Sequence, residues 1–134
     1  MTCRAYMPED FDTVKGWAEA KGIEIVPQLL SKTGFIAEAD GRPVMAVWAY
    51  LLFDVPIVQL DHLLSPPGTK IAEIRKAWEK LMIVIKDWIR IRNEKGGTGY
   101  CVIRCFIHER LAREAARAGW LVRNHNTHHC TLVL

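Results

Sequence analysis

The sequence lacks the features that would place it in a membrane or in an oxidising compartment. Its four cysteines, Cys3, Cys101, Cys105 and Cys130, form no Cys-x-x-Cys pair, and a signal peptide is not evident before the first folded-looking segment. The apolar run over residues 44–64 has the length of a membrane span, but Asp54, Pro56 and Asp61 interrupt it. We therefore expect a cytoplasmic protein with reduced cysteines and no membrane partner.

The sequence also lacks a block of charge of one sign. Its 18 Lys and Arg residues and 15 Asp and Glu residues are dispersed, and they leave a net charge of only +3. Nucleic-acid binding proteins concentrate basic residues on one face or in one run. We do not expect nucleic acid as a partner, and a small anionic ligand fits the composition better.

The length allows one ordinary domain. The 134 residues are 50% hydrophobic and 25% charged, the balance of a packed globular protein. Repeats, low-complexity segments and linkers are not evident, so we predict a single domain over residues 1–134.

The first half reads as a strand, a helix and three antiparallel strands. We predict a strand at 2–6 and a helix that begins at Pro8 and ends at Gly22. Asp40-Gly41 between two apolar runs is a strong hairpin signal, so strands are expected at 34–39 and 43–52, followed by another at 57–64.

The second half is organised around a long amphipathic helix. It is expected to begin at about Thr69 and to fade over residues 93–95, before a turn at 96–99. Its apolar stripe consists of Ile71, Ile74, Trp78, Leu81, Met82, Ile85, Trp88 and Ile89. A nearly continuous apolar run at 100–107 predicts a strand covered on both faces and parallel to strand 57–64. A helix at 108–118 capped by Gly119 and terminal strands at 121–134 complete a mixed α/β sheet flanked by helices.

This order of elements resembles the GNAT superfamily of acyl-CoA-dependent N-acyltransferases over nearly the whole chain. Arg4-x-x-x-Pro8-Glu9-Asp10-Phe11 is similar to the superfamily's first-helix start, and Ala118-Gly119-Trp120 resembles its Gly-aromatic motif. The turn at Thr33-Gly34, the hairpin Asp40-Gly41-Arg42-Pro43 and Asn124 to His128 look most like small members encoded by phages and prophages.

The resemblance implies that acetyl-CoA is the co-substrate. Its pyrophosphate would meet the N-terminus of the long helix, where free backbone N–H groups and the helix dipole favour an anion. The superfamily's loop reads Arg/Gln-x-x-Gly-x-Gly/Ala, but residues 69–74 here contain neither glycine, Ile74 would crowd the phosphate and Glu73 adds a negative charge. The residues implied in cofactor binding are Leu63, Leu64, Ser65, Thr69, Lys70, Ile71, Ala72 and Arg75.

The resemblance also implies the catalytic groups. Acylation of an amine requires a base for the ammonium and an acid for the departing thiolate. Asp61 matches the superfamily's carboxylate on the fourth strand, whereas regular alternation would turn His62 to the opposite face. The superfamily's general-acid Tyr is replaced by Ala115, which leaves His108 or water to protonate the thiolate.

Three functions are therefore compatible with the sequence. The favoured one is transfer of an acyl group to a small-molecule amine or a protein amino group. The apolar strands could also form a homodimer. The second is a catalytically inactive binding or regulatory protein of phage or prophage origin. The third is a metal site at His125, His128, His129 and Cys130, but a strand turns His129 away from its neighbours, so we predict no metal.

Overall fold

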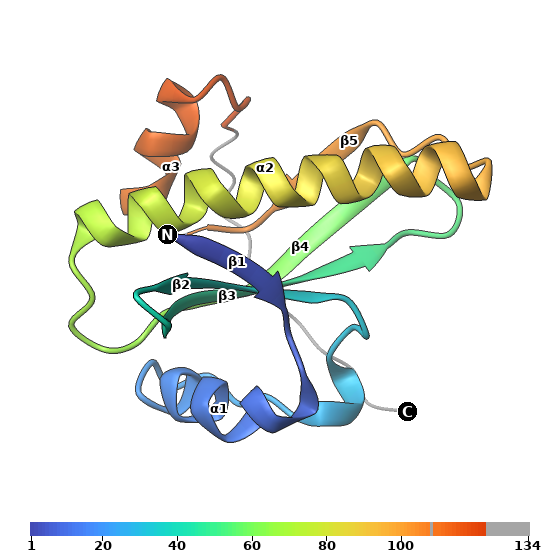
Figure 1. The fold of residues 1–134 in the computed structure, drawn as a ribbon. Helices are drawn as coiled ribbons and strands as arrows, with labels where there is room; N and C mark the ends of the chain where they lie inside the picture. Colours follow the sequence, from blue (N-terminus) through green and yellow to red (C-terminus); the bar gives the residue numbers. More distant parts are fainter. Residues whose placement is uncertain (108, 123–134) are drawn as a thin grey trace.

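The computed structural model describes residues 1–107 and 109–122, and this part of the chain forms one mixed sheet between helices (Figure 1). The strands lie in sequence order: β1 (Thr2–Ala5), β2 (Gly34–Ala39), β3 (Arg42–Leu51), β4 (Ile57–Leu64) and β5 (Val102–Cys105). β1 to β4 pair antiparallel, and β5 pairs parallel to β4. The predicted α/β class with a mixed sheet is confirmed.

The helices cover the two faces of the sheet. A 3-10 turn, η1 (Pro8–Asp10), leads into α1 (Phe11–Glu19) below the sheet in Figure 1, and α2 (Ile71–Gly96) lies above it. A second 3-10 turn, η2 (Pro27–Leu29), follows α1, and α3 (Glu109–Arg117) lies near the first turns of α2. The terminal strands predicted at 121–134 lie almost wholly outside the described residues.

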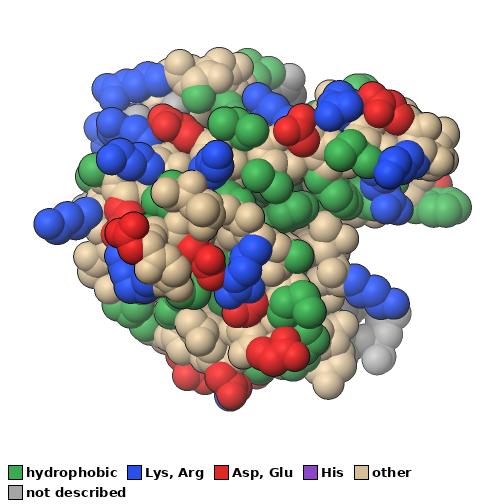
Figure 2. Space-filling model, viewed as in Figure 1, with side chains coloured by type: hydrophobic (Ala, Val, Ile, Leu, Met, Phe, Trp, Pro, Cys, Tyr) green, Lys and Arg blue, Asp and Glu red, His purple; other side chains and the backbone are tan. Residues whose placement is uncertain are grey.

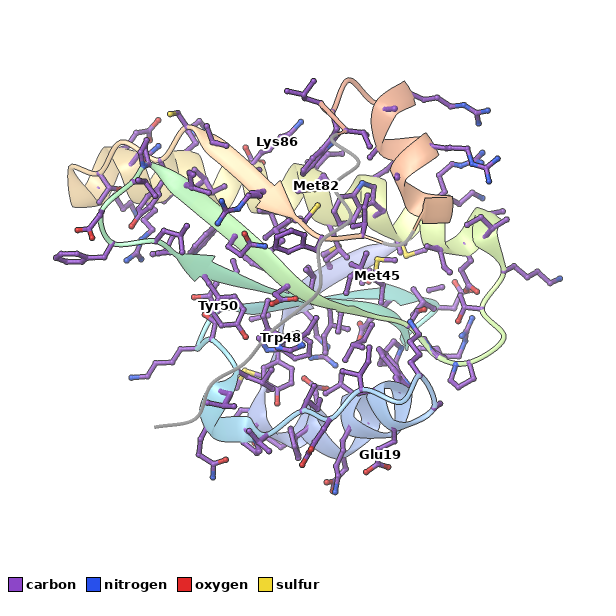
Figure 3. The ribbon with its side chains drawn as sticks, turned by 180° about the vertical axis from the view of Figure 1, so that it is seen from behind. Glu19, Met45, Trp48, Tyr50, Met82 and Lys86 are labelled. Carbon is purple, nitrogen blue, oxygen red and sulfur yellow. The ribbon has the colours of Figure 1, made fainter. Side chains whose placement is uncertain are left out.

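The apolar stripe of α2 packs on one face of the sheet. Trp78, Leu81 and Ile85 meet the side chains of Val47, Ala49 and Leu60 in a single buried cluster. Figure 3 shows Met45 of β3 and Met82 of α2 in this layer. Ile71 is the exception to the predicted stripe, because it is 48% exposed beside the start of the helix.

The bounds of α2 agree closely with the sequence prediction. The helix begins at Ile71, with Lys70 as its N-cap, and it continues past Asn93 to Gly96 before Gly97 turns left-handed at φ 62°. The Asn93 side chain, in the last turns of the helix, bonds the returning chain: Nδ2 donates to the Tyr100 carbonyl at 2.7 Å, and Oδ1 accepts from the Tyr100 amide at 3.0 Å. Asn93 thus fixes the start of the next strand.

The other face of the sheet packs on α1. Val14, Trp17 and Ala18 of α1 meet Ile36 of β2 and Trp48 of β3. Arg4 holds the start of this layer, because its guanidinium bonds Asp10 of η1 and Glu38 of β2, each at 2.7 Å. The adjoining guanidinium lowers the pKa of the Asp10 carboxyl below its usual value.

Two predictions about apolar runs had different outcomes. The run 44–64 is two strands joined by a turn, as predicted, and Phe53 at that turn is 99% exposed. The run 100–107 gives only the four-residue strand β5, whose residues are alternately exposed and half-buried, so the prediction of a strand covered on both faces is wrong. Within the described part, β5 is the last strand of the sheet and lacks a second neighbour. None of the helices described is long and apolar enough to cross a membrane.

Gly34 allows β2 to approach Trp48, and this closeness can be tested. A Cβ at Gly34 would lie 2.7 Å from both the Trp48 indole Nε1 and the Tyr6 Cβ. We expect Gly34→Ala to lower the free energy of unfolding by about 1–3 kcal/mol, as overpacked cores do. Gly16→Ala is the matched control, since its Cβ would meet nothing within 4 Å in α1, and it should raise stability by up to about 1 kcal/mol. Urea unfolding of both variants measures the difference, and equal effects would contradict the close approach.

Candidate functional site

The site lies where β4 and β5 separate. Their parallel ladder runs from Ile57 and Val102 to Leu60 and Cys105, whereas β4 continues to Leu64. Asp61 is therefore the first residue of β4 beyond the shared ladder. An extended molecule can enter between two strands that diverge in this way, because backbone groups that would otherwise pair across the sheet are left available.

A bulge in β4 changes which side chains reach this point. Ala46 pairs with Leu64 but Trp48 pairs with Asp61, so Val47 lies opposite two residues, His62 and Leu63. His62 takes the left-handed conformation, with φ 52°. A left-handed residue in a bulge bends the strand and redirects its side chains.

The bulge overturns the prediction that Asp61 and His62 face opposite ways. Asp61 lies directly across from Trp48, whose side chain is on the α1 side of the sheet. The His62 ring is 6.3 Å from the Trp48 ring and 6.4 Å from the Tyr50 ring, on that same side. Asp61 Oδ1 also accepts a hydrogen bond from the His62 amide at 2.8 Å, so the two residues form one local unit.

Five polar residues form a surface that we call the polar face: Tyr50, Gln59, Asp61, His62 and Arg104. Tyr50 pairs with Gln59 across β3 and β4, and Gln59 pairs with Arg104 across β4 and β5. Figure 3 shows Trp48 and Tyr50 on the side of the sheet turned away from α2. The polar face thus spans three strands beside the opening at Asp61.

Tyr50 keeps its proton on the polar face. Burial raises the pKa of the Tyr50 phenol, and the charge of Asp61 raises it further, against the lowering effect of a backbone hydrogen bond from the Ser31 region. The phenol donates to the Leu29 carbonyl at 3.2 Å, which ties β3 to η2. The polar face therefore presents a neutral hydroxyl beside a carboxylate.

A second feature lies at the end of β4, and we call it the loop cavity. It has a volume of about 530 Å³ and lies between the end of α1 and the start of α2. Its walls come from β3, β4, the loop after β4 and the first turn of α2: Met45, Leu63, Ser65, Pro66, Pro67, Gly68, Thr69, Ile71 and Ile74, with Lys21 from the end of α1. Lys21 Nζ donates to Ser65 Oγ at 3.3 Å, and burial lowers the pKa of this ammonium.

The start of α2 leaves backbone amides open to an anion. Lys70, the N-cap, makes no side-chain capping bond. Across the described residues, no acceptor pairs with the backbone N–H of Ile71 or Ala72. Uncapped amides at a helix N-terminus attract phosphate, and Lys21 brings a cation to the same cavity. Figure 2 shows Lys and Arg side chains gathered at the end of the molecule where α2 begins.

The residues that replace the superfamily's glycines are less disruptive than their types suggest. Ala72 is exposed, so its methyl group points away from the buried wall. The Glu73 carboxylate forms an ion pair with Arg42 at 2.6 Å, and this cation offsets the negative charge that Glu73 brings to the start of α2. Ile74 contributes to the wall of the loop cavity without filling it.

The predicted cofactor-binding residues divide into three groups. Leu63, Ser65, Thr69 and Ile71 line the loop cavity. Lys70, Ala72 and Arg75 are exposed on the first turns of α2. Leu64 is fully buried in the α1-side core, so its side chain cannot contact a ligand. His108, the predicted acid, lies outside the described residues.

Sequence reasoning missed Lys21, Tyr50, Gln59 and Arg104. Arg104 offered a signal, because a single arginine inside the apolar run 100–107 is unusual for a strand covered on both faces. Ala115, at the position of the superfamily's Tyr, is buried. No group of three or more metal-ligating side chains occurs among the described residues, and the histidines of the predicted metal alternative lie outside them.

Comparisons with solved structures establish the fold. The chain is similar to a possible acetyltransferase from Clostridium difficile 630, with 13% identity, a TM-score of 0.63 and coverage of 99% of this chain and 98% of the other. It is also similar to an aminoglycoside acetyltransferase from an uncultured soil metagenomic sample in complex with sisomicin, at 15% identity and a TM-score of 0.63, covering 99% and 95%. An aminoglycoside N-acetyltransferase in complex with CoA matches at 15% identity and a TM-score of 0.60, covering 99% and 100%.

The chain therefore has the fold of the GNAT-type acetyltransferases. No protein-family model and no curated protein sequence matches it.

The left-handed backbone at His62 can be tested by paired substitutions. Asn tolerates φ near 52° and Val does not, while both variants lose the imidazole ring. We expect the free energy of unfolding of His62→Val to be about 1–2 kcal/mol lower than that of His62→Asn. Chemical denaturation of the two variants gives the difference. Equal stabilities would mean that β4 is regular at this point.

Proposed function

We propose that this protein is an acyl-CoA-dependent N-acyltransferase that moves an acetyl group to the amine of a small molecule or a protein. The observation that supports the proposal most directly is that an opening in the sheet and an uncapped helix start both lie along β4. β4 leaves its ladder with β5 at Asp61, and it ends beside the uncapped start of α2. A thioester lying along β4 would place its carbonyl near Asp61 and its phosphates near Ile71 and Ala72. Such a reaction belongs where acyl-CoA is found, which agrees with the cytoplasmic location expected from the cysteines.

Two similar structures contain ligands that fit this proposal. One aminoglycoside N-acetyltransferase was solved with CoA, and another aminoglycoside acetyltransferase with the amine sisomicin. In this chain, the amides of Ile71 and Ala72 and the Lys21 ammonium would hold the diphosphate. Leu63 and Met45 would provide apolar contact for the arm that joins the diphosphate to the thioester.

Asp61 is the proposed base. It is exposed on the polar face, and it accepts one proton from the substrate ammonium, directly or through a water molecule. The neutral amine then forms a nitrogen–carbon bond to the thioester carbonyl carbon. When the tetrahedral intermediate collapses, the carbon–sulfur bond breaks, and the second amine proton reaches the thiolate sulfur. The proton on Asp61 is released to solvent, so charge and atoms balance.

The proton that reaches the sulfur needs a carrier. Ala115 cannot supply one, and the described residues beside Cys105 offer no second acid. Burial raises the pKa of the Cys105 thiol to about 11, so this cysteine is protonated and inert at neutral pH. His108, two residues beyond Phe106, remains the proposed carrier, with water as the alternative.

A catalytically inactive protein of phage or prophage origin is the second proposal from the sequence. The absence of the loop glycines and the alanine at the usual Tyr position, Ala115, motivated it. The open amides and the Arg42–Glu73 pair weaken the first of these arguments, and the second stands. The homodimer is likewise a proposal, although both faces of the central strands are already covered by helices. Binding without transfer in the experiments below would favour the inactive protein.

Acetyl-CoA should stabilise the folded protein, because a ligand that binds only the native state raises its unfolding free energy. At about 100 times its dissociation constant the gain is about 2.7 kcal/mol, which raises the melting temperature by several degrees. We expect Lys21→Gln to reduce this shift, while Lys15→Gln, exposed on α1 beside Glu19, keeps it. Dephospho-CoA and ATP separate recognition of the thioester arm from recognition of phosphate alone. Equal shifts with ATP and acetyl-CoA would argue against a thioester site.

Asp61→Asn tests the base. Removal of a positioned general base lowers kcat by about 100- to 10,000-fold. The melting shift with acetyl-CoA should persist, because the carboxylate is not part of the diphosphate site. Asp12→Asn, an exposed carboxylate on α1, is the matched control. The measurement is thiol release from acetyl-CoA in the presence of an amine acceptor, and full activity in Asp61→Asn would remove Asp61 from the mechanism.

A further inference from the structure

The polar face holds two opposite charges that do not pair with each other. Asp61 is on β4 and Arg104 is on β5, one strand across and two residues along from it. Neighbouring strands are about 4.8 Å apart and two residues span about 6.6 Å, so the two backbones are about 8 Å apart. Extended side chains can bridge that diagonal, yet the ion pairs of the described residues include none between Asp61 and Arg104.

Gln59 explains why the pair does not form. Arg104 Nε donates to Gln59 Oε1 at 2.7 Å, and Gln59 Nε2 donates to the Leu60 carbonyl at 3.1 Å. Gln59 is 9% exposed, so this amide is held in one orientation by both bonds. It therefore fixes the guanidinium over its own position on the strand.

The bond through Nε leaves the outer edge of the guanidinium open. Both terminal nitrogens of Arg104 are without a hydrogen-bond acceptor among the described residues. These two nitrogens form the fork that binds a carboxylate through two parallel hydrogen bonds. On the other side of Gln59, the exposed Asp61 carboxylate is suited to an ammonium.

We propose that the acceptor is an amine that also carries a carboxylate, of the α-amino acid class. This inference rests on the proposed function, because Asp61 must receive the ammonium that is acetylated. The ammonium of the acceptor lies at Asp61 and its carboxylate at the Arg104 fork. Both charged side chains of the polar face then have an ion-pair partner of opposite sign. The two charged groups of an α-amino acid are carried by one carbon, so the Asp61 and Arg104 side chains would reach toward each other across the diagonal of about 8 Å between their backbones.

The surrounding side chains indicate where the rest of the acceptor lies. The His62 ring lies between those of Trp48 and Tyr50 on the α1 side of the sheet, at centroid distances of 6.3 and 6.4 Å. Trp48 is fully buried, so the half-buried rings of His62 and Tyr50 are the ones that could contact an apolar or aromatic substituent. A polyamine or an aminoglycoside has no anionic group, and Arg104 would repel its additional ammonium groups.

The test compares acceptors that differ only in the acid. Thiol release from acetyl-CoA is measured with the twenty common L-amino acids, with the carboxamide of each, and with spermidine and kanamycin as amines without an acid. We expect at least one free acid to exceed its carboxamide in kcat/KM by about 10- to 100-fold, the value of a charge-assisted hydrogen-bond pair.

Arg104→Gln should remove that preference by raising KM for the acid while leaving the carboxamide unchanged. Arg104→Lys keeps the positive charge but lacks the two-nitrogen fork, so it should retain part of the preference for the acid. Arg90→Gln is the matched control, since it removes the same charge on the outer side of α2, where Arg90 pairs with Asp87 and Glu94. Retained melting shifts with acetyl-CoA show that each variant is folded.

The outcomes separate this inference from the function on which it rests. Equal rates for acids and carboxamides, or a preference for spermidine or kanamycin, overturn the acid-bearing acceptor and retain the acetyltransferase. An equal loss for acids and carboxamides in Arg104→Gln also overturns the inference, because it shows a structural role. Absence of transfer to every amine in the panel overturns the acid-bearing acceptor, and absence of a melting shift with acetyl-CoA as well overturns the acetyltransferase.

Discussion

The left-handed backbone of His62 is the constraint on which the site depends. It inserts one extra residue into β4 opposite Val47, and it ends the regular pairing of this strand where β5 also departs. Without it, Asp61 and His62 would alternate across the sheet, and His62 would lie in the apolar layer under α2. With it, a carboxylate, an imidazole and a phenol share one surface. A non-glycine residue in this conformation costs free energy, and the rings of Trp48 and Tyr50 around His62 supply packing that offsets the cost.

The middle and the end of β4 carry different groups. At the polar face, side chains are the proposed reacting groups, and their positions follow from the register of three strands. At the loop cavity beyond Leu64, backbone amides are the proposed anion-binding groups, because the first turn of α2 has no side-chain cap. The resemblance implies that GNAT proteins use loop glycines to bring amides near phosphate. In this chain we propose that the amides of Ile71 and Ala72 take that role, with Lys21, just after α1, as the cation and with Arg42 offsetting the charge of Glu73.

Much of the fold could be predicted from residue patterns. β2 and β4 lie at their predicted bounds, since Asp40-Gly41 marks a hairpin and both central residues adopt positive φ. The glycines at 96–99 predicted the end of α2, whereas the hydrogen bonds from Asn93 to a residue seven positions later could not be predicted. The orientation of His62 was also inaccessible, since a bulge in β4 has no sequence signal as clear as a glycine. Arg104 was overlooked because its neighbours are apolar, although the single charge in that run was the best available indication of the polar face.

The two hydrogen bonds between Asn93 and Tyr100 also limit where insertions and deletions can be accepted in this part of the chain. It joins the last turns of α2 to the residue just before β5, so the number of residues between Lys70 and Asn93 determines where β5 begins along β4. An insertion or deletion inside α2 would rotate the apolar stripe and shift β5 against β4 together. The turn over residues 96–99 contains three glycines and lies between the two hydrogen-bonded ends. Length variation among descendants of this chain should therefore collect in that turn and be absent from the helix before it.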